Sequence, residues 1–158
     1  MQRAIVGYHK DEEDDWVAEL DCYHNQHVRH QPPFFNRPWT QSQQGRDSML
    51  GEQLNCVRCD ALEWPEGLQL LRKTEVFTEQ NFPQGLKKDH STKPGVWARL
   101  VIVKGVMLYV CQDPVSESFQ LDAETPGLIP PQLAHHVEPS GEVQFFLEFF
   151  SRPAGYYR

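Results

Sequence analysis

Two short groups of metal-binding residues constrain the fold of this chain more than any other feature. Cys22-Tyr23-His24 is a Cys-x-His pair, and Cys56-Val57-Arg58-Cys59 is a Cys-x-x-Cys pair. A Cys-x-x-Cys turn places two sulfur atoms at a separation that suits one edge of a zinc tetrahedron. The chain between the two groups can bring them together. We therefore expect a zinc site formed by Cys22, His24, Cys56 and Cys59, whose binding energy stabilises a small module with little core.

The choice of histidine is left open by the sequence, because His24, His27 and His30 all follow Cys22 closely. His27 is the main alternative to His24. Four protein ligands leave no position for water, so the expected site is structural. A redox role of the thioredoxin type is disfavoured because no βαβ pattern surrounds Cys56 and Cys59. The four cysteines are also too few for a disulfide scaffold of this length.

The first sixty residues otherwise predict a small β module. Residues 4–8 and 16–20 form a candidate hairpin, and the acidic run 11–15 is interpreted as its solvated turn. The prolines within 31–40 exclude a regular helix. Residues 42–50 predict one short helix that Gly51 ends. We place the junction at 60–67 and predict two domains, residues 1–62 and 63–158.

The second half has a β pattern throughout. Short apolar segments are separated by Gly and Pro turns, which is typical of a sandwich or barrel. No helix is expected after residue 67. The predicted strands are residues 68–71, 75–78, 96–103, 107–112, 118–121, 127–129, 136–138 and 143–150.

The block from Asp21 to Trp39 resembles a small bacterial family of unknown function. Members of that family read Cys-Gly-His where this chain has Cys22-Tyr23-His24, and they end in Cys-x-x-Cys. The resemblance spans about residues 1–60. It implies the metal site and the domain boundary, and it implies no activity.

In the second half, two stretches resemble the motifs of cupin barrels. Pro130-Pro131 is a rigid turn that precedes His135, as in the outline of the second cupin motif. The stretch 89–105 has the position of the first motif, but only His90 of its usual ligands remains. The fold class is therefore expected to be mainly β, with a zinc-stabilised β module followed by a cupin-like antiparallel β-barrel or jelly roll.

Glu148 is a candidate third ligand beside these histidines. It is a lone carboxylate in an apolar strand, where an unpaired charge is costly to bury. We expect His90, His135 and Glu148 to share a divalent metal such as Zn, Fe or Mn. The equally favoured alternative is an internal ion pair between Arg99 and Glu148. His136 should face away from His135, since neighbouring residues of a strand point to opposite sides.

Residues 66–152 closely resemble the TehB/YeaR-like family, a cupin-like domain found alone or fused to tellurite-resistance methyltransferases. This resemblance implies a cupin-type barrel, a metal-binding pocket and a link to oxyanion stress from tellurite, nitrate or nitrite. Lys93, Trp97 and Arg99 are then expected to line the ligand pocket. No Gly-rich nucleotide loop follows a strand, so no methyltransferase activity is carried over. The matching text is Pro65-Glu66-Gly67, residues 74–77, Pro83-x-Gly85-Leu86, residues 90–100, Gly105, Pro130-Pro131, His135 and Glu148-Phe149.

Charge and hydropathy limit the partners. The net charge is -7, and no basic stripe of the kind that binds nucleic acid is present. No apolar run approaches the roughly 20 residues of a membrane helix, and the N-terminus has no signal-peptide layout, so a cytoplasmic protein is expected. A small-molecule or oxyanion ligand and a homodimer formed through sheet edges are the expected partners. Cys111 is interpreted as a buried, inert thiol.

Two functions fit these features. The first is a metal-binding cupin-like protein linked to oxyanion stress, in which the barrel metal holds a ligand. The second is a non-catalytic ligand-sensing or scaffold protein with no metal in the barrel, where Arg99 and Glu148 pair instead. The fold alone does not decide whether the protein is an enzyme.

Overall fold

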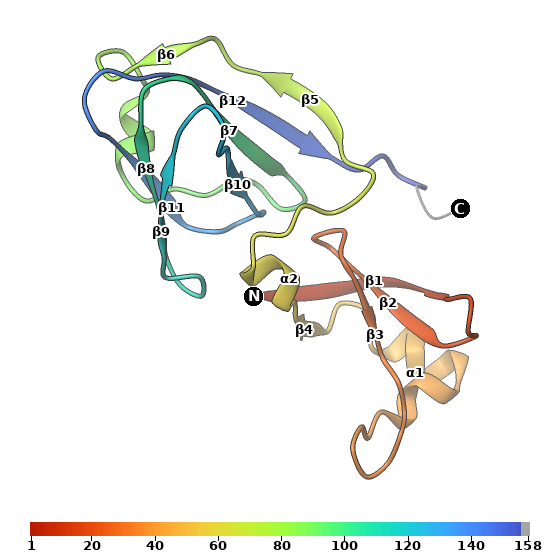
Figure 1. The fold of residues 1–158 in the computed structure, drawn as a ribbon. Coiled ribbons are helices and arrows are strands. Elements are labelled where there is room, and N and C mark those ends of the chain that lie inside the picture. The colour runs from red at the N-terminus through yellow and green to blue at the C-terminus, as the bar shows by residue number, and fades with distance from the viewer. Residues whose placement is uncertain (156–158) are drawn as a thin grey trace. The chain divides into compact units, whose positions relative to one another are not determined.

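The computed structural model describes residues 1–155 and divides the chain into two compact units, Met1–Cys59 and a second unit that begins at Asp60. The first unit contains the predicted hairpin as strands β1 (Gln2–Lys10) and β2 (Trp16–Leu20), paired antiparallel from Lys10 opposite Trp16 (Figure 1). β3 (Asn25–His27) and β4 (Gln53–Asn55) extend it to a four-stranded sheet in the order β3-β2-β1-β4.

The acidic run closes this hairpin. Oδ1 of Asp11 accepts hydrogen bonds from the backbone N–H groups of Glu13 and Asp15, each at 2.9 Å. Asp14 has a φ of 66°, a left-handed conformation that Asp tolerates better than most residues. The run of carboxylates is therefore explained by turn geometry, because short acidic side chains hydrogen-bond the backbone of the turn itself.

Three short helices complete the first unit and its boundary: η1 (Pro38–Gln41), α1 (Gln43–Ser48) and α2 (Val57–Asp60). Helix α1 lies inside the predicted segment 42–50. The hydroxyl of Ser42 accepts from the N–H of Gly45 and caps its first turn, and Gly51 follows with a φ of 87°. Strands β3 and β4 and helix α2 were not predicted, because they are too short to show a periodicity.

The second unit is built from antiparallel strands, and every strand predicted there is present. Strands β10, β7, β12 and β5 are hydrogen-bonded in that order, with β6 also on β12, and β11, β8 and β9 form a three-stranded sheet (Figure 1). One 3-10 helix, η2 (Gln84–Lys87), was not predicted. The strands are β5 (Gln69–Lys73), β6 (Phe77–Thr78), β7 (Trp97–Lys104), β8 (Met107–Cys111), β9 (Ser118–Leu121), β10 (Gly127–Ile129), β11 (His135–Pro139) and β12 (Gln144–Ser151).

The two sheets of the second unit share an apolar core. At Gly127 an added Cβ would lie 2.8 Å from Leu121 and 3.3 Å from Tyr109, so the sheets approach closely there. The hydroxyl of Tyr109 donates to the carbonyl of Leu128 at 3.0 Å and ties β8 to β10. The mainly β class is confirmed, while closure into a cupin-type jelly roll stays a prediction. Within residues 1–155, no helix is long and apolar enough to cross a membrane.

The faces of β7 and β12 alternate, and this decides which side chains reach the core. Leu100 on β7 is opposite Leu147 on β12, and both are buried. One residue along each strand, Arg99 is opposite Glu148. Because successive side chains of a strand point to opposite faces, Arg99 and Glu148 lie on the face away from Leu100 and Leu147.

Candidate metal centre and cavity

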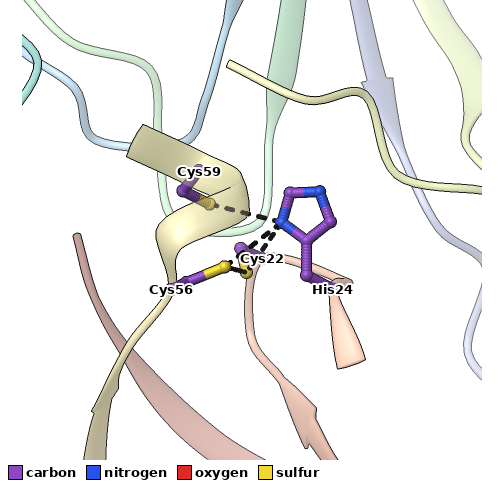
Figure 2. Close-up of side chains that lie close together, drawn as sticks. All are labelled: Cys22, His24, Cys56 and Cys59. Carbon is purple, nitrogen blue, oxygen red and sulfur yellow. Dashed lines mark hydrogen bonds between the residues drawn. The ribbon is translucent and has the colours of Figure 1, made fainter. Parts of the chain in front are cut away.

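The four residues predicted to bind zinc meet at one place in the first unit (Figure 2). Cys22 and His24 lie in the tight turn between β2 and β3, where the N–H of Leu20 donates to the carbonyl of His24 at 3.0 Å. Cys56 follows β4 directly, and Cys59 lies one turn later in α2. A hairpin turn and the start of a helix therefore supply two ligands each.

The turn that holds Cys22 and His24 depends on Tyr23. Its φ is 74°, in the left-handed region, and its N–H donates to the carbonyl of Leu20 at 2.8 Å. Glycine adopts this conformation at little cost, whereas other residues do so rarely. This geometry gives a physical reason for the Cys-Gly-His pattern of the similar sequences, from which the present chain departs at Tyr23.

The distances within the cluster are those of a tetrahedron. Nδ1 of His24 lies 3.6, 3.4 and 3.5 Å from the Sγ atoms of Cys22, Cys56 and Cys59, and the Sγ atoms of Cys22 and Cys56 are 3.8 Å apart. With Zn–S near 2.3 Å and Zn–N near 2.0 Å, tetrahedral zinc would have S–S edges of about 3.8 Å and S–N edges of about 3.5 Å. The donor set and its spacing therefore fit a metal ion such as zinc.

Burial and mutual hydrogen bonds shift the pKa values of the buried cysteines in opposite directions. All four ligand residues are at most 3% exposed. Hydrogen bonds from Cys22 and Cys59 lower the pKa of the Cys56 thiol, whereas the bonds to Cys56 and Cys59, together with burial, raise the pKa of Cys22. Among these cysteines, the hydrogen bonds therefore favour the thiolate at Cys56, the form in which a cysteine binds zinc.

Arg3 adds a positive charge to this environment. The residue is 3% exposed, Nη2 lies 2.8 Å from Sδ of Met1, and its charge favours the thiolate form of Cys59. Arg3 was not predicted as a residue of this site. Its position on the inward face of β1, between the buried residues Met1 and Ile5, was the available signal.

The other two histidines of the first unit lie outside the cluster. Nε2 of His27 lies 2.7 Å from a carboxylate oxygen of Asp11, and Nδ1 of His30 accepts from the N–H of Arg37 at 3.0 Å. The structure therefore selects His24 over His27. Asp11, Glu13 and Asp15 also lie close together, but the carboxylate of Asp11 is already used by the turn.

In the second unit, His90 and His135 lie side by side. Their backbones form a two-way bridge with N–H···O distances of 2.9 Å in each direction, and the ring centroids are 4.2 Å apart. Nδ1 of His90 lies 3.0 Å from the carbonyl of Lys88, and Nδ1 of His135 lies 2.8 Å from the carbonyl of Leu133. Because a carbonyl only accepts, Nδ1 carries the hydrogen in both rings.

Both histidines line a cavity of about 480 Å³. Its walls are mostly apolar, and its polar members come from the loop after η2, from the edge strand β5 and, for His135, from β11. Lys93 is among them, as predicted for a ligand pocket, and so is Arg72, which the sequence analysis did not identify. The lining residues are Leu71, Arg72, Leu86, His90, Ser91, Thr92, Lys93, Val96, Ala98, Ile129, His135, Leu147 and Phe149.

The predicted three-ligand metal site in this cavity is wrong. Glu148 does not line the cavity; its Oε1 accepts a hydrogen bond from Nε of Arg99 at 3.0 Å on the other face of the sheet. Strand alternation causes this, since Leu147 and Phe149 on either side of Glu148 do face the cavity. The ion pair between Arg99 and Glu148, predicted as the alternative, is present.

Trp97 and Arg99 are likewise corrected as pocket residues, because neither lines the cavity. The ring centroids of Trp97 and Trp64 are 5.6 Å apart, and the guanidinium of Arg99 lies 5.8 Å from the Trp64 ring. Both residues therefore take part in a buried aromatic cluster with Phe150, on the face of β7 and β12 opposite the cavity.

His136 and Cys111 belong neither to the cysteine–histidine cluster nor to the cavity wall. His136 lies between Asp89 and Glu138, with ring nitrogens 2.8 and 2.9 Å from their carboxylate oxygens. Cys111 is 2% exposed in β8, and burial raises the pKa of its thiol. A thiol in this state is a poor nucleophile.

Comparison with known proteins finds two family matches that follow one another along the chain. Residues 6–63 match a family described as a protein of unknown function, DUF3565, and residues 72–147 match the TehB-like domain. The probable S-adenosyl-L-methionine-dependent methyltransferase TehB of Haemophilus influenzae is 28% identical over 91 residues, which are 54% of this chain and 32% of that protein. The chain thus spans less than two thirds of the length of this relative.

Two solved structures are each similar to more than half of the chain. The crystal structure of TehB from Haemophilus influenzae has a TM-score of 0.51 at 25% identity and covers 55% of this chain and 32% of TehB. A crystal structure of a protein from Escherichia coli K12 has a TM-score of 0.53 at 24% identity, covers 58% of this chain and 97% of that protein, and shows the fold alone. Of the expected resemblances, the match to DUF3565 and the match to the TehB-like domain are found in the expected order, while the cupin-type architecture stays a prediction.

Proposed function

We propose that this protein is a zinc-stabilised small-molecule-binding protein. A structural zinc ion holds the first unit together, and the second unit binds its ligand in the cavity beside His135. The observation that carries the proposal is the buried cluster of Cys22, His24, Cys56 and Cys59, whose spacing and donor chemistry suit tetrahedral zinc.

The role of the zinc ion follows from its complete set of protein ligands. Cys22, His24, Cys56 and Cys59 would occupy all four positions, so no open position remains for a water or a substrate. The first unit has 59 residues, a size at which a single apolar core contributes only a few kcal/mol of stability. Metal binding would therefore supply folding energy here and no catalytic step.

For the second unit, binding is favoured over metal-dependent catalysis. Glu148 is paired with Arg99, and the cavity offers two histidines, whereas catalytic zinc sites generally use three protein ligands. A cavity of about 480 Å³ is within the range that holds small molecules. These features support the non-catalytic ligand-sensing role. We retain the cupin-type barrel as the proposed architecture of this unit.

The link to oxyanion stress is a further part of this proposal. It rests on the tellurite-resistance association of the family that residues 66–152 resemble, whereas the relative TehB is described as a probable S-adenosyl-L-methionine-dependent methyltransferase. That description belongs to TehB, of which this chain matches 32%. We propose no methyl transfer for the present chain.

Elemental analysis of the purified full-length protein tests the zinc site. We expect one zinc ion per chain, lost in Cys56→Ala and retained in Cys111→Ala. Cys111 is the matched control because it too is a buried free cysteine but lies outside the cluster. Equal zinc content in the two variants, or no zinc in the parent protein after refolding with zinc, would refute the proposed site.

A further inference from the structure

The cavity beside His135 has a charge pattern that indicates the class of its ligand. Arg72 and Lys93 line it, and none of its lining residues is acidic. Within residues 1–155, neither cation has a carboxylate within 4 Å. A site that presents two cations and no anion attracts a negatively charged ligand.

The backbone holds Lys93 in place at this cavity. The hydroxyl of Thr92 donates to the carbonyl of Val96 at 2.7 Å and accepts from the N–H of Gln132 at 3.3 Å. The N–H of Val96 donates to the carbonyl of Lys93 at 3.1 Å, which closes a turn through Gly95 with a φ of 71°. The loop that carries Lys93 is therefore fixed from both sides.

Arg72 is held differently, by an aromatic ring of the cavity wall. Its guanidinium carbon lies 4.6 Å from the ring centroid of Phe149, and both residues line the cavity. Such a contact orients the guanidinium and leaves its N–H groups free to bind an anion. Arg72 and Lys93 are exposed residues, so solvent screening limits what each contributes.

The cavity is too large and too apolar for an inorganic oxyanion alone. An oxyanion of four or five atoms would fill on the order of 100 Å³, taking roughly 30 Å³ for each water-sized group. The cavity measures about 480 Å³, and its remaining wall includes Ile129, Leu147 and Phe149. A ligand with an apolar body would remove this wall from water.

The histidines add a requirement for a hydrogen-bond donor. Nδ1–H of His135 is used by the carbonyl of Leu133, so the acceptor nitrogen that remains in the neutral ring is Nε2. The same arrangement holds for His90 and the carbonyl of Lys88. A ligand hydroxyl or N–H would satisfy one of these nitrogens.

We propose that the cavity binds a small organic acid with an apolar body and a hydroxyl or N–H group. Arg72 and Lys93 neutralise its anionic group, and the hydroxyl or N–H donates to Nε2 of His135. This inference rests on the proposed small-molecule-binding function and specifies its ligand. It does not depend on the zinc site of the first unit.

Isothermal titration of the zinc-loaded full-length protein with three matched probes tests this inference. Mandelate carries a charge, a hydroxyl and a phenyl ring; phenylacetate lacks the hydroxyl; mandelamide lacks the charge. We expect mandelate to bind, phenylacetate to bind about five-fold more weakly and mandelamide about ten-fold more weakly. Lys93→Gln and Arg72→Gln should each weaken mandelate several-fold without affecting mandelamide.

Lys104→Gln is the matched control for these variants, because Lys104 is an exposed lysine of β7 that does not line the cavity. His135→Gln should reduce the preference for mandelate over phenylacetate. If that variant fails to fold, the other measurements still test the inference. Lys93→Gln and Arg72→Gln test whether the ligand must carry a negative charge, and the comparison with phenylacetate tests whether it must carry a hydrogen-bond donor.

Three outcomes would overturn the inference. Mandelamide binding as tightly as mandelate would show that the ligand need not be an anion, while leaving small-molecule binding intact. Displacement of mandelate by nitrate or tellurite at lower concentration would assign the cavity to an inorganic oxyanion. If none of the three probes binds, the proposed small-molecule function of the second unit fails as well.

Discussion

Nδ1 of His24 lies 3.4 Å from Sγ of Cys56, although 32 residues separate them in the chain. The contact joins the turn between β2 and β3 to the residue that follows β4. These strands do not touch each other, since β1 lies between them in the sheet. The cluster therefore connects parts of the first unit that the sheet leaves apart.

Removal of zinc should unfold the first unit. Structural zinc contributes roughly 10–16 kcal/mol in small zinc modules, which exceeds the whole stability of a unit of 59 residues. In an NMR spectrum of the full-length protein, chelation should collapse the amide signals of residues 1–59 and spare those of the second unit. Restoring zinc should bring the signals back. Unchanged signals from the first unit after chelation would contradict a structural role.

Arg3 should strengthen zinc binding through its charge. Zinc with three thiolates and a neutral imidazole has one net negative charge, which the buried guanidinium of Arg3 would compensate. We expect Arg3→Met to weaken zinc about ten-fold in competition with a chromogenic chelator.

Arg3→Lys should recover most of the zinc affinity, because it keeps the charge. Arg29→Met is the control, since Arg29 pairs with Asp15 on the surface. Equal losses in Arg3→Met and Arg3→Lys would mean that Arg3 acts through packing alone.

The zinc cluster could be predicted from the sequence because its spacing reflects local chemistry. A Cys-x-x-Cys turn and a Cys-x-His turn each fix two ligands within a few residues, whatever the chain between them does. The strands of the second unit were also predictable, since Gly and Pro mark their ends. The exact ligand, His24 or His27, required the structure.

The cavity could be predicted only in part, because it depends on strand registers. His90 and His135 were identified from motifs, but the face on which Glu148 lies follows from its position relative to Leu147 and Phe149. In a strand that is apolar on both faces, the sequence does not indicate which face is inward. Arg72 was missed for a related reason, since an edge strand of exposed residues shows no pattern.

The ion pair between Arg99 and Glu148 should have a small stabilising effect and no effect on metal content. The side chain of Arg99 is 39% exposed, so solvent screens the pair. A double-mutant cycle with Arg99→Met and Glu148→Gln should give a coupling of about 0.5–1 kcal/mol by urea denaturation. If the Glu148→Gln variant lost a bound metal ion, Glu148 would be a metal ligand, contrary to its pairing with Arg99.

Stability of the second unit should fall as the pH is lowered through the titration range of His135. Burial, followed by the charge of His90, lowers the pKa of His135 to about 4 from its ordinary value near 6.5. Below pH 6.5 the unfolded state therefore binds a proton that the folded state does not. The stabilisation is complete above pH 6.5 and is lost between pH 6.5 and 4, a change on the order of 3 kcal/mol.

Urea denaturation at several pH values should show this dependence, and His135→Gln should flatten it. The neighbouring His136 has the opposite effect on the pH dependence of stability, since its hydrogen bonds to Glu138 and Asp89 raise its pKa. His136 therefore stabilises the fold at low pH, and its contribution is lost as the pH rises through its folded pKa. The same flattening in His136→Gln would contradict the assignment to His135.

Replacement of Tyr23 by glycine should stabilise the first unit. Tyr23 adopts a φ of 74° between two of the cluster residues, where a side chain costs about 1 kcal/mol relative to glycine. Glycine also gives the unfolded chain more freedom, which offsets part of the gain. We expect Tyr23→Gly to raise the unfolding free energy of the zinc-loaded unit by up to about 1 kcal/mol.

Gly51→Ala is the reverse test, because Gly51 has a φ of 87° and nothing within 4 Å of an added Cβ, so only backbone strain opposes it. A destabilising Tyr23→Gly would mean that contacts of the Tyr23 ring outweigh its backbone strain.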